Sequence, residues 1–364
     1  MASNDRLGLE GVFVEDELPL LIRRQGMADW CDGVVRILDR RALPHEERYV
    51  DCSRVEDVAR CIEDMVIQGA FSLSVAAGYG LALATEARAG GNDQDFAALE
   101  KGCARLLKTR PTGLALHRML AACLDAARIA IERGDSPREA ILATVDRAAA
   151  ALARQGYQTG RTACELLADG ATVLTHCFPD RSYAYMLVEA RRIGKTINVI
   201  ASETRPYLQG ARLTALCAIQ AGCDVKVITD GMGGFLMRRG QVDAFVTAAD
   251  RVCMDGTVCN KVGTYQYALA AHANGVPYFV LRQSGPDVES ANESAVEVEF
   301  RDGEEIVNIG GVRSAPAGVS GLYPAFDCTP PELVTRIVTD RGAFRAHDIA
   351  AYVDAEPFVR DAVV

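Results

Sequence analysis

The residues best suited to chemistry lie in the segment 242–265, which reads VDAFVTAADRVCMDGTVCNKVGTY. An apolar run typical of a buried strand leads into small residues and then Asp250. A carboxylate at the carboxyl end of a strand lies where open α/β sheets place their chemistry. Asn260 and Lys261 precede a helix predicted from Thr264, and a helix N-terminus suits an anion because its unpaired N–H groups and its dipole point there. The segment is therefore either an acid/base group beside an anion site, or a surface loop in which Asp250 is a solvated charge or a helix cap.

Polar side chains also follow three other predicted strands: Cys177, Glu203 with Arg205, and Asp230. Because right-handed crossovers bring successive strand ends to one edge of a sheet, we expect these groups to converge with Asp250. The proton of Cys177 can be made labile at a strand–helix junction, and a shielded Asp250 would have a raised pKa. A thiol and a carboxyl on either side of a small substrate make an acid/base pair. The alternative for Cys177, one of twelve cysteines, is a packed core thiol.

The second half of the chain alternates between strands and helices. Strands are predicted at 170–175, 197–201, 225–229, 242–246 and 277–281, and helices at 181–193, 206–222, before Gly240, and at 264–274. Mostly apolar strands in such alternation predict a parallel sheet covered on both faces, and so a Rossmann-like domain. No GxGxxG motif opens it, so no dinucleotide is inferred. Thr329 is predicted to cap a helix at 331–338, and the last ~20 residues form an amphipathic tail.

The first half is predicted to be mostly helical. We expect a helical N-terminal domain at 1–155 with a short β-hairpin, and a Rossmann-like catalytic domain at 156–364. Residues 1 to about 25 read as an extension, 30–44 as the hairpin and 51–53 as a helix cap, with helices at 55–67, 73–85, 95–108, 114–133 and 136–155. The small residues of 73–85 let another helix or a ligand come close. Arg110 either interacts with a helix dipole or binds an anion.

Composition excludes several classes of function. A length of 364 residues suits two domains, and a net charge of −10 argues against nucleic acid as the main ligand. No apolar run reaches the ~18–20 residues of a membrane span, and the start does not read as a signal peptide. The cysteines are scattered without a CxxC pair, which favours reduced, buried thiols and a cytoplasmic location. The five histidines lack metal-ligand spacing, so no structural metal is expected.

Taken in order, these segments resemble the methylthioribose-1-phosphate isomerase family. That family is related to ribose-1,5-bisphosphate isomerases and to the regulatory alpha, beta and delta subunits of the translation-initiation nucleotide-exchange factor. The resemblance runs from about Trp30 to Phe344 and is densest in ETRPYLQGARLTAL (203–216), 228–237, 243–265 and IGGVRSAPAGVSGLYPAFDCT (309–329). It implies a helical domain followed by a Rossmann-like domain, a homodimer, and catalysis by Cys177 and Asp250 without a cofactor. It places substrate contacts at Gln68, Gly69, Ala70, Arg110, Gln209, Asn260 and Lys261.

Three stretches depart from the family pattern. Gln68 stands where the family has an arginine, so a hydrogen-bond donor remains but its charge is lost. Cys177-Phe178-Pro179-Asp180 replaces Cys-Asn-Ala-Gly, a bulkier and stiffer turn beside the thiol, and Gly231 replaces an asparagine. Because the Cys–Asp pair and Asn260-Lys261 remain, this pattern favours isomerase chemistry on an altered substrate, or a drifted site, over a purely regulatory protein.

The resemblance implies an aldose–ketose isomerase that converts a 5-substituted ribose 1-phosphate to the ribulose 1-phosphate by Cys/Asp acid–base chemistry. Its first candidate substrate is S-methyl-5-thioribose 1-phosphate, which would place the chain in methionine salvage. One alternative is the same chemistry on 5-deoxyribose 1-phosphate or ribose 1,5-bisphosphate. Another is a non-catalytic sensor of a sugar phosphate or nucleotide. The expected partner is a small phosphorylated sugar, with no nucleic acid and no membrane.

Overall fold

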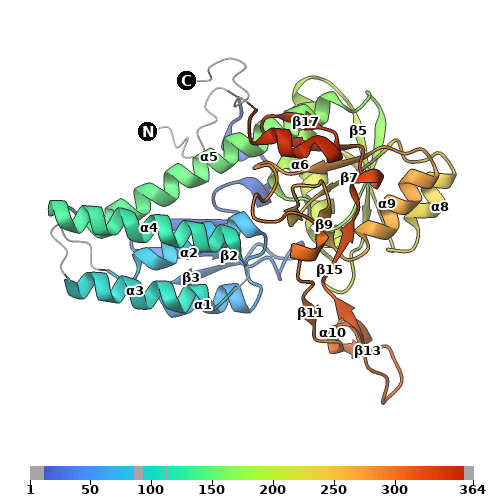
Figure 1. Ribbon diagram of the computed structural model, residues 1–364. Helices are drawn as coiled ribbons and strands as arrows, with labels where there is room; N and C mark the ends of the chain where they lie inside the picture. Colours follow the sequence, from blue (N-terminus) through green and yellow to red (C-terminus); the bar gives the residue numbers. More distant parts are fainter. Residues whose placement is uncertain (1–11, 86–92, 111–112, 356–364) are drawn as a thin grey trace. The chain divides into compact units, whose positions relative to one another are not determined.

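The computed structural model describes residues 12–85, 93–110 and 113–355 (Figure 1). The contacts between residues divide the chain into two compact units, one through Arg154 and one from Gln155. The helix α5 (Pro137–Glu165) crosses that division, so it runs well past the end predicted near residue 155. Past residue 155 the helix contains Gly156 and Gly160, which are poor helix formers, so tertiary packing rather than local propensity extends it. A Cβ atom at Gly160 would lie only 2.6 Å from the backbone nitrogen of Met186.

The N-terminal unit combines a small antiparallel sheet with helices. Its elements are η1 (Glu15–Glu17), η2 (Leu20–Ile22), β1 (Ala28–Cys31), β2 (Val34–Leu38), β3 (Tyr49–Cys52), α1 (Val55–Glu63), α2 (Ala70–Ala82), α3 (Asp93–Leu107) and α4 (Leu114–Arg133). The predicted hairpin is correct for β1 and β2, but the sheet has a third strand, because β3 pairs with β2. Residues 51–53 are thus not the helix cap: Asp51 lies in β3, and α1 is capped at Arg54, whose N–H donates to Asp57 at 3.1 Å.

The stretch before residue 25 is not a loose extension where the structure describes it. Leu20, Leu21 and Ile22 are buried. Arg24 is buried as well, and its guanidinium donates to Asp29 at 2.6 Å and to Asp146 at 2.7 Å. Burial of three aliphatic side chains and a paired guanidinium fixes this segment to the N-terminal unit.

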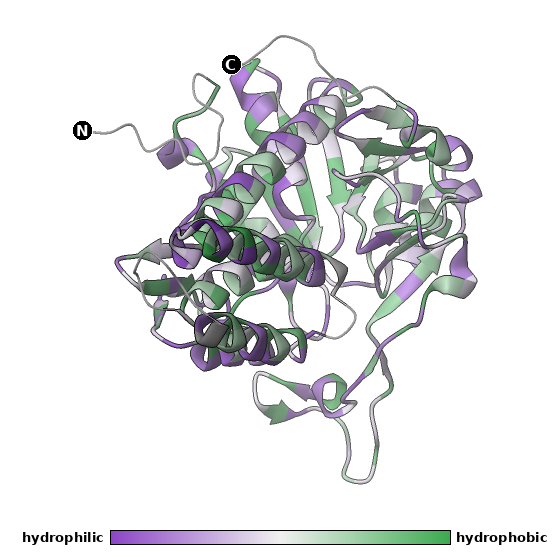
Figure 2. Cartoon of the chain, turned by 60° about the vertical axis from the view of Figure 1, so that its left-hand side comes forward, coloured by the Kyte–Doolittle hydropathy of each residue, from purple (hydrophilic) through white to green (hydrophobic). Residues whose placement is uncertain are grey.

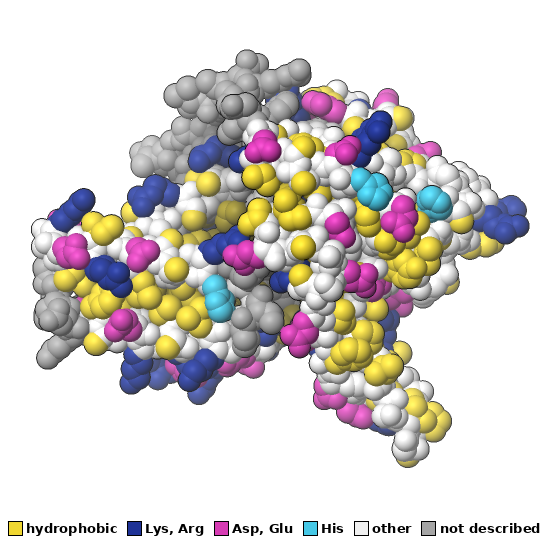
Figure 3. Space-filling view, in the orientation of Figure 1, with side chains coloured by type: hydrophobic (Ala, Val, Ile, Leu, Met, Phe, Trp, Pro, Cys, Tyr) yellow, Lys and Arg dark blue, Asp and Glu magenta, His cyan; other side chains and the backbone are white. Residues whose placement is uncertain are grey.

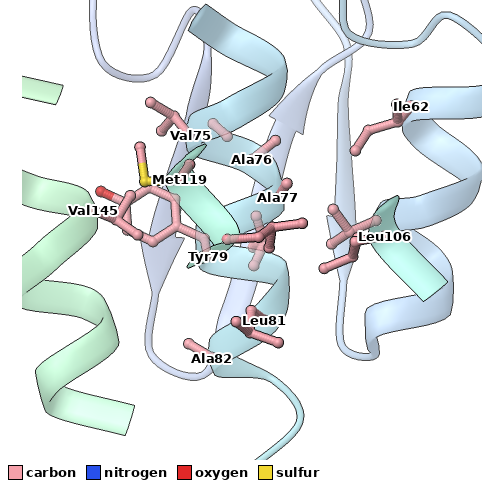
Figure 4. Packing of buried hydrophobic residues seen from close by; sticks show 14 of the residues in the cluster. Ile62, Val75, Ala76, Ala77, Tyr79, Leu81, Ala82, Leu106, Met119 and Val145 are labelled. Carbon is pink, nitrogen blue, oxygen red and sulfur yellow. The ribbon is translucent and has the colours of Figure 1, made fainter. Parts of the chain in front are cut away.

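The small residues of α2 serve helix packing. A Cβ atom at Gly78 would lie 2.5 Å from Val145 of α5, and one at Gly80 would lie 2.9 Å from Val58 of α1. Figure 4 shows how closely the side chains from neighbouring helices surround α2. Close backbone approach therefore accounts for these two glycines.

The C-terminal unit is built on a seven-stranded sheet in the order β17-β16-β10-β7-β4-β5-β6, parallel except for β17. Its strands are β4 (Ala171–Thr175), β5 (Ile197–Ser202), β6 (Asp224–Ile228), β7 (Ala244–Ala248), β10 (Tyr278–Leu281), β16 (Arg336–Thr339) and β17 (Gly342–Phe344). The helical elements are α6 (Asp180–Arg192), η3 (Gly210–Thr214), α7 (Ala215–Gln220), α8 (Gly233–Arg238), α9 (Thr264–Ala273), η4 (Glu293–Ala295), η5 (Pro331–Leu333) and η6 (Ala346–Tyr352). Figure 2 shows the largely hydrophobic strands of this sheet between helices of mixed hydropathy. The predicted α/β fold, with helices first and a parallel sheet second, is confirmed.

Two helices of this unit were placed wrongly from sequence. The helix predicted from Pro206 begins only at Gly210, because the left-handed backbone of Thr204 and Leu208 turns the chain first. The helix predicted at 331–338 is a short turn, η5, followed by β16. Ile337 and Val338 are buried in the sheet there, so tertiary packing overrides the local pattern.

Two smaller structures extend this unit. A second, antiparallel sheet contains β8 (Arg251–Val252), β9 (Val258–Lys261) and β15 (Phe326–Thr329), in the order β15-β9-β8. Between them in sequence, residues 299–325 form an arm that projects from the unit (Figure 1). The arm contains β11 (Phe300–Arg301), α10 (Glu304–Val307), β12 (Asn308–Ile309), β13 (Val312–Arg313) and β14 (Tyr323–Pro324). Figure 3 shows apolar side chains on its surface, and those exposed are Phe300, Ile309, Val312, Val319 and Leu322.

Three properties of the described residues concern membranes, thiols and metal ions. No helix among them is both long and apolar enough to cross a bilayer. All twelve cysteines lie in the described ranges as free thiols, and eight of them are buried. Within the same ranges, no cluster of three or more His, Cys, Asp or Glu side chains is arranged to hold a metal ion.

Candidate active site

The parallel sheet brings the predicted strand-end groups to one edge. β7 pairs with β4, and β4 pairs with β5, all parallel. Their carboxyl ends lead directly to Asp250, Cys177 and Glu203 respectively. Neighbouring parallel strands end at the same side of a sheet, so Cys177 and Asp250 emerge beside one another.

Cys177 is held in an unusual and well-anchored backbone conformation. Its φ is +66°, in the left-handed region that non-glycine residues seldom adopt. Its N–H donates to the Thr204 hydroxyl at 2.9 Å, and its carbonyl accepts from the Thr214 hydroxyl at 2.6 Å. Backbone strain that surrounding hydrogen bonds maintain is typical of functional sites. These bonds aim the half-buried thiol, and burial raises its pKa to about 11, so the thiol form dominates near neutrality.

Asp250 keeps solvent-accessible surface but is surrounded closely enough for its ionisation to change. Desolvation by neighbouring protein raises the pKa of this carboxyl. The cations Lys261, Arg282 and Arg301 limit the rise, whereas Asp180, at the start of α6, adds to it. A raised pKa makes a carboxyl easier to protonate, which is the property that a general acid needs.

Lys261 carries a positive charge that lowers the pKa values of both Cys177 and Asp250. Its side chain is only 4% exposed, and burial lowers the pKa of its ammonium. In the part of the chain that the structure describes, the ammonium has no hydrogen-bond or ion-pair partner; it faces the rings of Phe326 at 4.9 Å and Tyr323 at 5.7 Å. Asp250 and Glu299 lie near enough to raise its pKa in part, but no carboxylate of the described residues hydrogen-bonds to it, so an anionic ligand would compensate its charge further.

The helix N-terminus after Lys261 is filled, contrary to the sequence-based expectation of an open anion site. Asp327 accepts hydrogen bonds from the backbone N–H groups of Gly263 at 2.6 Å and Tyr265 at 3.2 Å. Asn260 turns its amide to the Thr264 hydroxyl at 3.0 Å. The protein thus supplies its own carboxylate to the start of α9, and the remaining positive charge for a ligand is that of Lys261.

Gln209 offers an acceptor without a partner. It is 9% exposed, and its amide oxygen is buried without a hydrogen-bond partner among the described residues. It directly precedes η3, a π-helical turn, a feature often found at functional sites. Gly210 permits this approach, because a Cβ there would lie 1.7 Å from the Ser202 carbonyl oxygen.

Asp230 and its neighbours organise the loop after β5. The Asp230 carboxylate accepts from the N–H groups of Thr204 and Arg205, each at 2.8 Å. His176 donates from Nε2 to the Val262 carbonyl at 2.9 Å, so its Nδ1 accepts from the Ser202 hydroxyl at 2.6 Å. Burial lowers the pKa of His176, which keeps it neutral. These residues position the site by fixing its loops.

Four predicted contacts belong to the N-terminal unit. Gln68 donates from its amide to the Met65 carbonyl at 3.2 Å, and Arg110 donates to the Met65 sulfur at 2.7 Å and to the Ile62 carbonyl at 3.1 Å. Gly69, with φ +92°, precedes α2, whose first residue is Ala70. Both polar side chains therefore meet at the turn that ends α1, a convergence that the sequence did not indicate.

Arg301 is a candidate that sequence reasoning missed. It lies in β11 at the base of the arm, forms an ion pair with Glu299 at 2.9 Å, and stacks over Phe326 and Tyr207. It is close enough to lower the pKa values of both Cys177 and Asp250. Its only signal in the sequence is one arginine in a charged stretch, EFRDGEE, which reads equally well as a solvated surface.

Comparison with known proteins identifies relatives over nearly the whole chain. Residues 66–346 match the model of the initiation factor 2 subunit family. A protein named methylthioribose-1-phosphate isomerase from Syntrophotalea carbinolica is 39% identical over 334 residues, which cover 87% of this chain and 95% of that protein.

Two solved structures are similar in fold and in sequence. The 5-methylthioribose 1-phosphate isomerase of Pyrococcus horikoshii has a TM-score of 0.81 at 30% identity, covering 94% of this chain and 97% of that chain. The delta subunit of the translation initiation factor eIF-2B from A. fulgidus has a TM-score of 0.78 at 34% identity, covering 88% and 95%. One fold therefore carries both an enzyme name and an initiation-factor name.

Proposed function

Since this chain belongs to the initiation factor 2 subunit family, we propose that it is the isomerase of a 5-substituted ribose 1-phosphate, converting it to the ribulose 1-phosphate. The chain is an enzyme of the isomerase class, as are its relatives at 35–39% identity. S-methyl-5-thioribose 1-phosphate is the first substrate to test, because those relatives carry that name. The reaction belongs to methionine salvage.

The buried ammonium of Lys261, to which no carboxylate of the described residues is hydrogen-bonded, is the observation that carries this proposal. A phosphate would supply an anion that hydrogen-bonds to this ammonium. Lys261 is near enough to Cys177 and Asp250 to affect the pKa values of both. A phosphate bound to Lys261 would therefore hold the sugar against the thiol and the carboxyl.

The chemistry must begin with ring opening, because the phosphate on the C1 oxygen masks the aldehyde. Asp250, whose pKa is raised by burial of its carboxyl, gives a proton to the ring oxygen as the bond from C1 to that oxygen breaks. The hydrogen on C2 then moves to C1, and the Cys177 thiol assists this transfer. The C2 hydroxyl becomes the ketone, and its proton returns to Asp250. Every atom is conserved, and no external oxidant or reductant is needed.

A second substrate is favoured by the two departures that change charge. Gln68 removes a positive charge from a predicted contact, and Asp180 adds a negative charge close enough to raise the pKa of Asp250. Both changes disfavour a second phosphate on the sugar. Among the alternatives, 5-deoxyribose 1-phosphate therefore ranks above ribose 1,5-bisphosphate.

A panel of sugar phosphates tests the proposal. We expect turnover of methylthioribose 1-phosphate, a smaller but measurable kcat/KM for 5-deoxyribose 1-phosphate, and the lowest value for ribose 1,5-bisphosphate. Binding of a sugar phosphate or nucleotide without turnover of any of the three would instead favour the sensor function. That outcome would agree with the initiation-factor name of the structural relative at 34% identity.

We also propose that the chain forms a homodimer. The exposed apolar side chains of the arm provide a surface of the kind that protein interfaces use. Light scattering coupled to size exclusion should give twice the chain mass of 39.1 kDa. A monomer at micromolar concentration would contradict this proposal.

A further inference from the structure

Two cysteines face each other across the strands that carry Lys261. β9 and β15 pair antiparallel, and the register sets Cys259 directly opposite Cys328. Each of the two thiols shifts the pKa of the other, so the two side chains lie near each other. Cys259 is 5% exposed and Cys328 is half-buried, so one thiol of the pair is within reach of small solutes.

The hydrogen-bond pattern shows which kind of pair this is. The Val262 N–H donates to the Ala325 carbonyl at 3.1 Å, one step beyond the pair formed by Lys261 and Phe326. Hydrogen-bonded and non-hydrogen-bonded pairs alternate along an antiparallel ladder. The pair formed by Val262 and Ala325 is hydrogen-bonded, and the cysteine pair lies three pairs along the ladder from it. The cysteine pair is therefore non-hydrogen-bonded.

The other side of β9 gives the same answer. The Cys253 N–H donates to the Thr257 carbonyl at 2.8 Å, and the register from there makes Arg251 the hydrogen-bonded partner of Cys259. The backbone polar groups of Cys259 thus point to β8 and away from β15. In a non-hydrogen-bonded pair the Cα atoms are ~4.5 Å apart, at the short end of the range that disulfides span.

The pair lies on the face of the site. Side chains two apart along a strand share a face, so Cys259 lies with Lys261, and Cys328 lies with Phe326. Lys261 and Phe326 are themselves opposite each other, with the ammonium 4.9 Å from the ring centroid. Asn260 and Asp327 point to the other face, where Asp327 caps α9.

We propose that Cys259 and Cys328 form a reversible cross-strand disulfide when the protein meets a peroxide, and that this disulfide weakens the neighbouring anion site. The hydrogen bond from Cys259 lowers the pKa of Cys328, which favours its thiolate as the attacking group. The Cys328 thiolate attacks a peroxide oxygen, and the peroxide bond breaks to give a sulfenic acid and water. Cys259 then attacks the sulfenic sulfur and expels a second water. Two thiols lose two electrons and two protons, and the peroxide gains both.

The disulfide would draw β9 and β15 together by a small distance that is sufficient to displace the Lys261 ammonium. Opposite Cβ atoms in such a pair are ~4.5–5.5 Å apart, whereas a disulfide holds them near ~3.8 Å. A shift of about 1 Å at a position two residue pairs from Lys261 would change the position of its ammonium, and misplacement on that scale can cost up to about a hundredfold in rate. The effect on turnover rests on the proposed function, but formation of the bond does not.

A second thiol pair in the chain provides an internal control. Cys52 of β3 and Cys61 of α1 have their sulfur atoms 3.6 Å apart, and both are buried, at 0% and 5% exposure. Neither offers the half-buried thiol that Cys328 has. The pair at 259 and 328 should therefore oxidise first.

The test treats the full-length protein with hydrogen peroxide, blocks remaining thiols with N-ethylmaleimide, and maps peptides by mass spectrometry without reduction. We expect a peptide linking residues 259 and 328 that dithiothreitol separates. Isomerase activity should fall roughly ten- to a hundredfold with the same dose dependence and return on reduction. Cys328→Ser and Cys259→Ala should keep basal activity and lose the response to peroxide, whereas Cys52→Ala should retain it.

Absence of the linked peptide at doses that oxidise other thiols would overturn the proposal, as would a linked peptide between residues 52 and 61 alone. Formation of the 259–328 link without loss of activity would refute the coupling to the site. If the chain has no isomerase activity at all, the linked peptide still decides whether the disulfide exists, so failure of the proposed function is distinguishable.

Discussion

The hydroxyl of Thr214 donates a 2.6 Å hydrogen bond to the carbonyl oxygen of Cys177, and it does so from the π-helical turn η3. This bond ties the strained backbone of the candidate catalytic thiol to a second element. The π-helical turn, the left-handed φ of Cys177 and the close approach of Gly210 to Ser202 are thus parts of one arrangement.

Removing this bond should loosen the thiol. In Thr214→Val the Cys177 carbonyl loses its buried donor, which costs about 1–3 kcal/mol of unfolding free energy, and kcat should fall more than KM rises. Thr175→Val is the matched control, because the buried hydroxyl of Thr175 lacks a partner among the described residues. That control should lose neither stability nor activity, and equal effects of the two changes would contradict the role of the bond.

Lys261→Met should have opposite effects on stability and function. Burial of this ammonium without a hydrogen-bonded carboxylate among the described residues destabilises the free protein, so a thioether of similar shape should raise the Tm. The same change should abolish the stabilisation that a sugar phosphate gives in a thermal-shift titration. Lys195→Met is the comparison: its ammonium donates to two carbonyls at 2.8 Å, so that change should lower the Tm and leave ligand binding intact. A fall in Tm for Lys261→Met would show that the ammonium is already compensated.

The strand ends were predictable from sequence, but the detail of the site was not. Asp250 and Cys177 follow strands whose apolar composition marks them as buried, and parallel topology then places them together. By contrast, Asp327 fills the helix N-terminus that the sequence predicted to be free for an anion. It reaches that position because β15 pairs with β9, although paired residues such as Phe326 and Lys261 are 65 positions apart in the chain. No local pattern encodes such a pairing. Arg301 was missed for the same reason.

Asp327 should give a measurable dependence of stability on pH. Burial raises the pKa of this carboxyl from 3.8 to about 6. The folded state therefore binds a proton that the unfolded state has lost between these values, so this group's stabilising contribution is complete below pH 3.8 and disappears as the pH rises through about 6. Urea denaturation of the wild type should show the unfolding free energy falling as the pH rises through this window, and Asp327→Asn should remove that fall. The same fall in the variant would show that another group binds the proton.

Gln68→Arg tests the altered-substrate hypothesis. The Gln68 amide donates to the Met65 carbonyl, on the turn that Arg110 also contacts. If the substrate keeps the family's phosphate placement, an arginine should tighten methylthioribose 1-phosphate by about 1–2 kcal/mol through charge-assisted hydrogen bonds. If another group occupies that place, the new charge should weaken the native substrate. The kcat/KM values of the wild type and of Gln68→Arg for methylthioribose 1-phosphate and 5-deoxyribose 1-phosphate decide between these outcomes. Unchanged values on every substrate would show that Gln68 lies outside the site.

The central claim is that Cys177 and Asp250 act together on a sugar 1-phosphate. Its most direct test is the turnover of methylthioribose 1-phosphate by the wild type, Cys177→Ser and Asp250→Asn, with circular dichroism to confirm that each variant folds. We predict that each variant loses several kcal/mol of transition-state stabilisation, on the scale where about 1.36 kcal/mol is tenfold in rate, while still binding the substrate. Full activity in either folded variant would contradict the account.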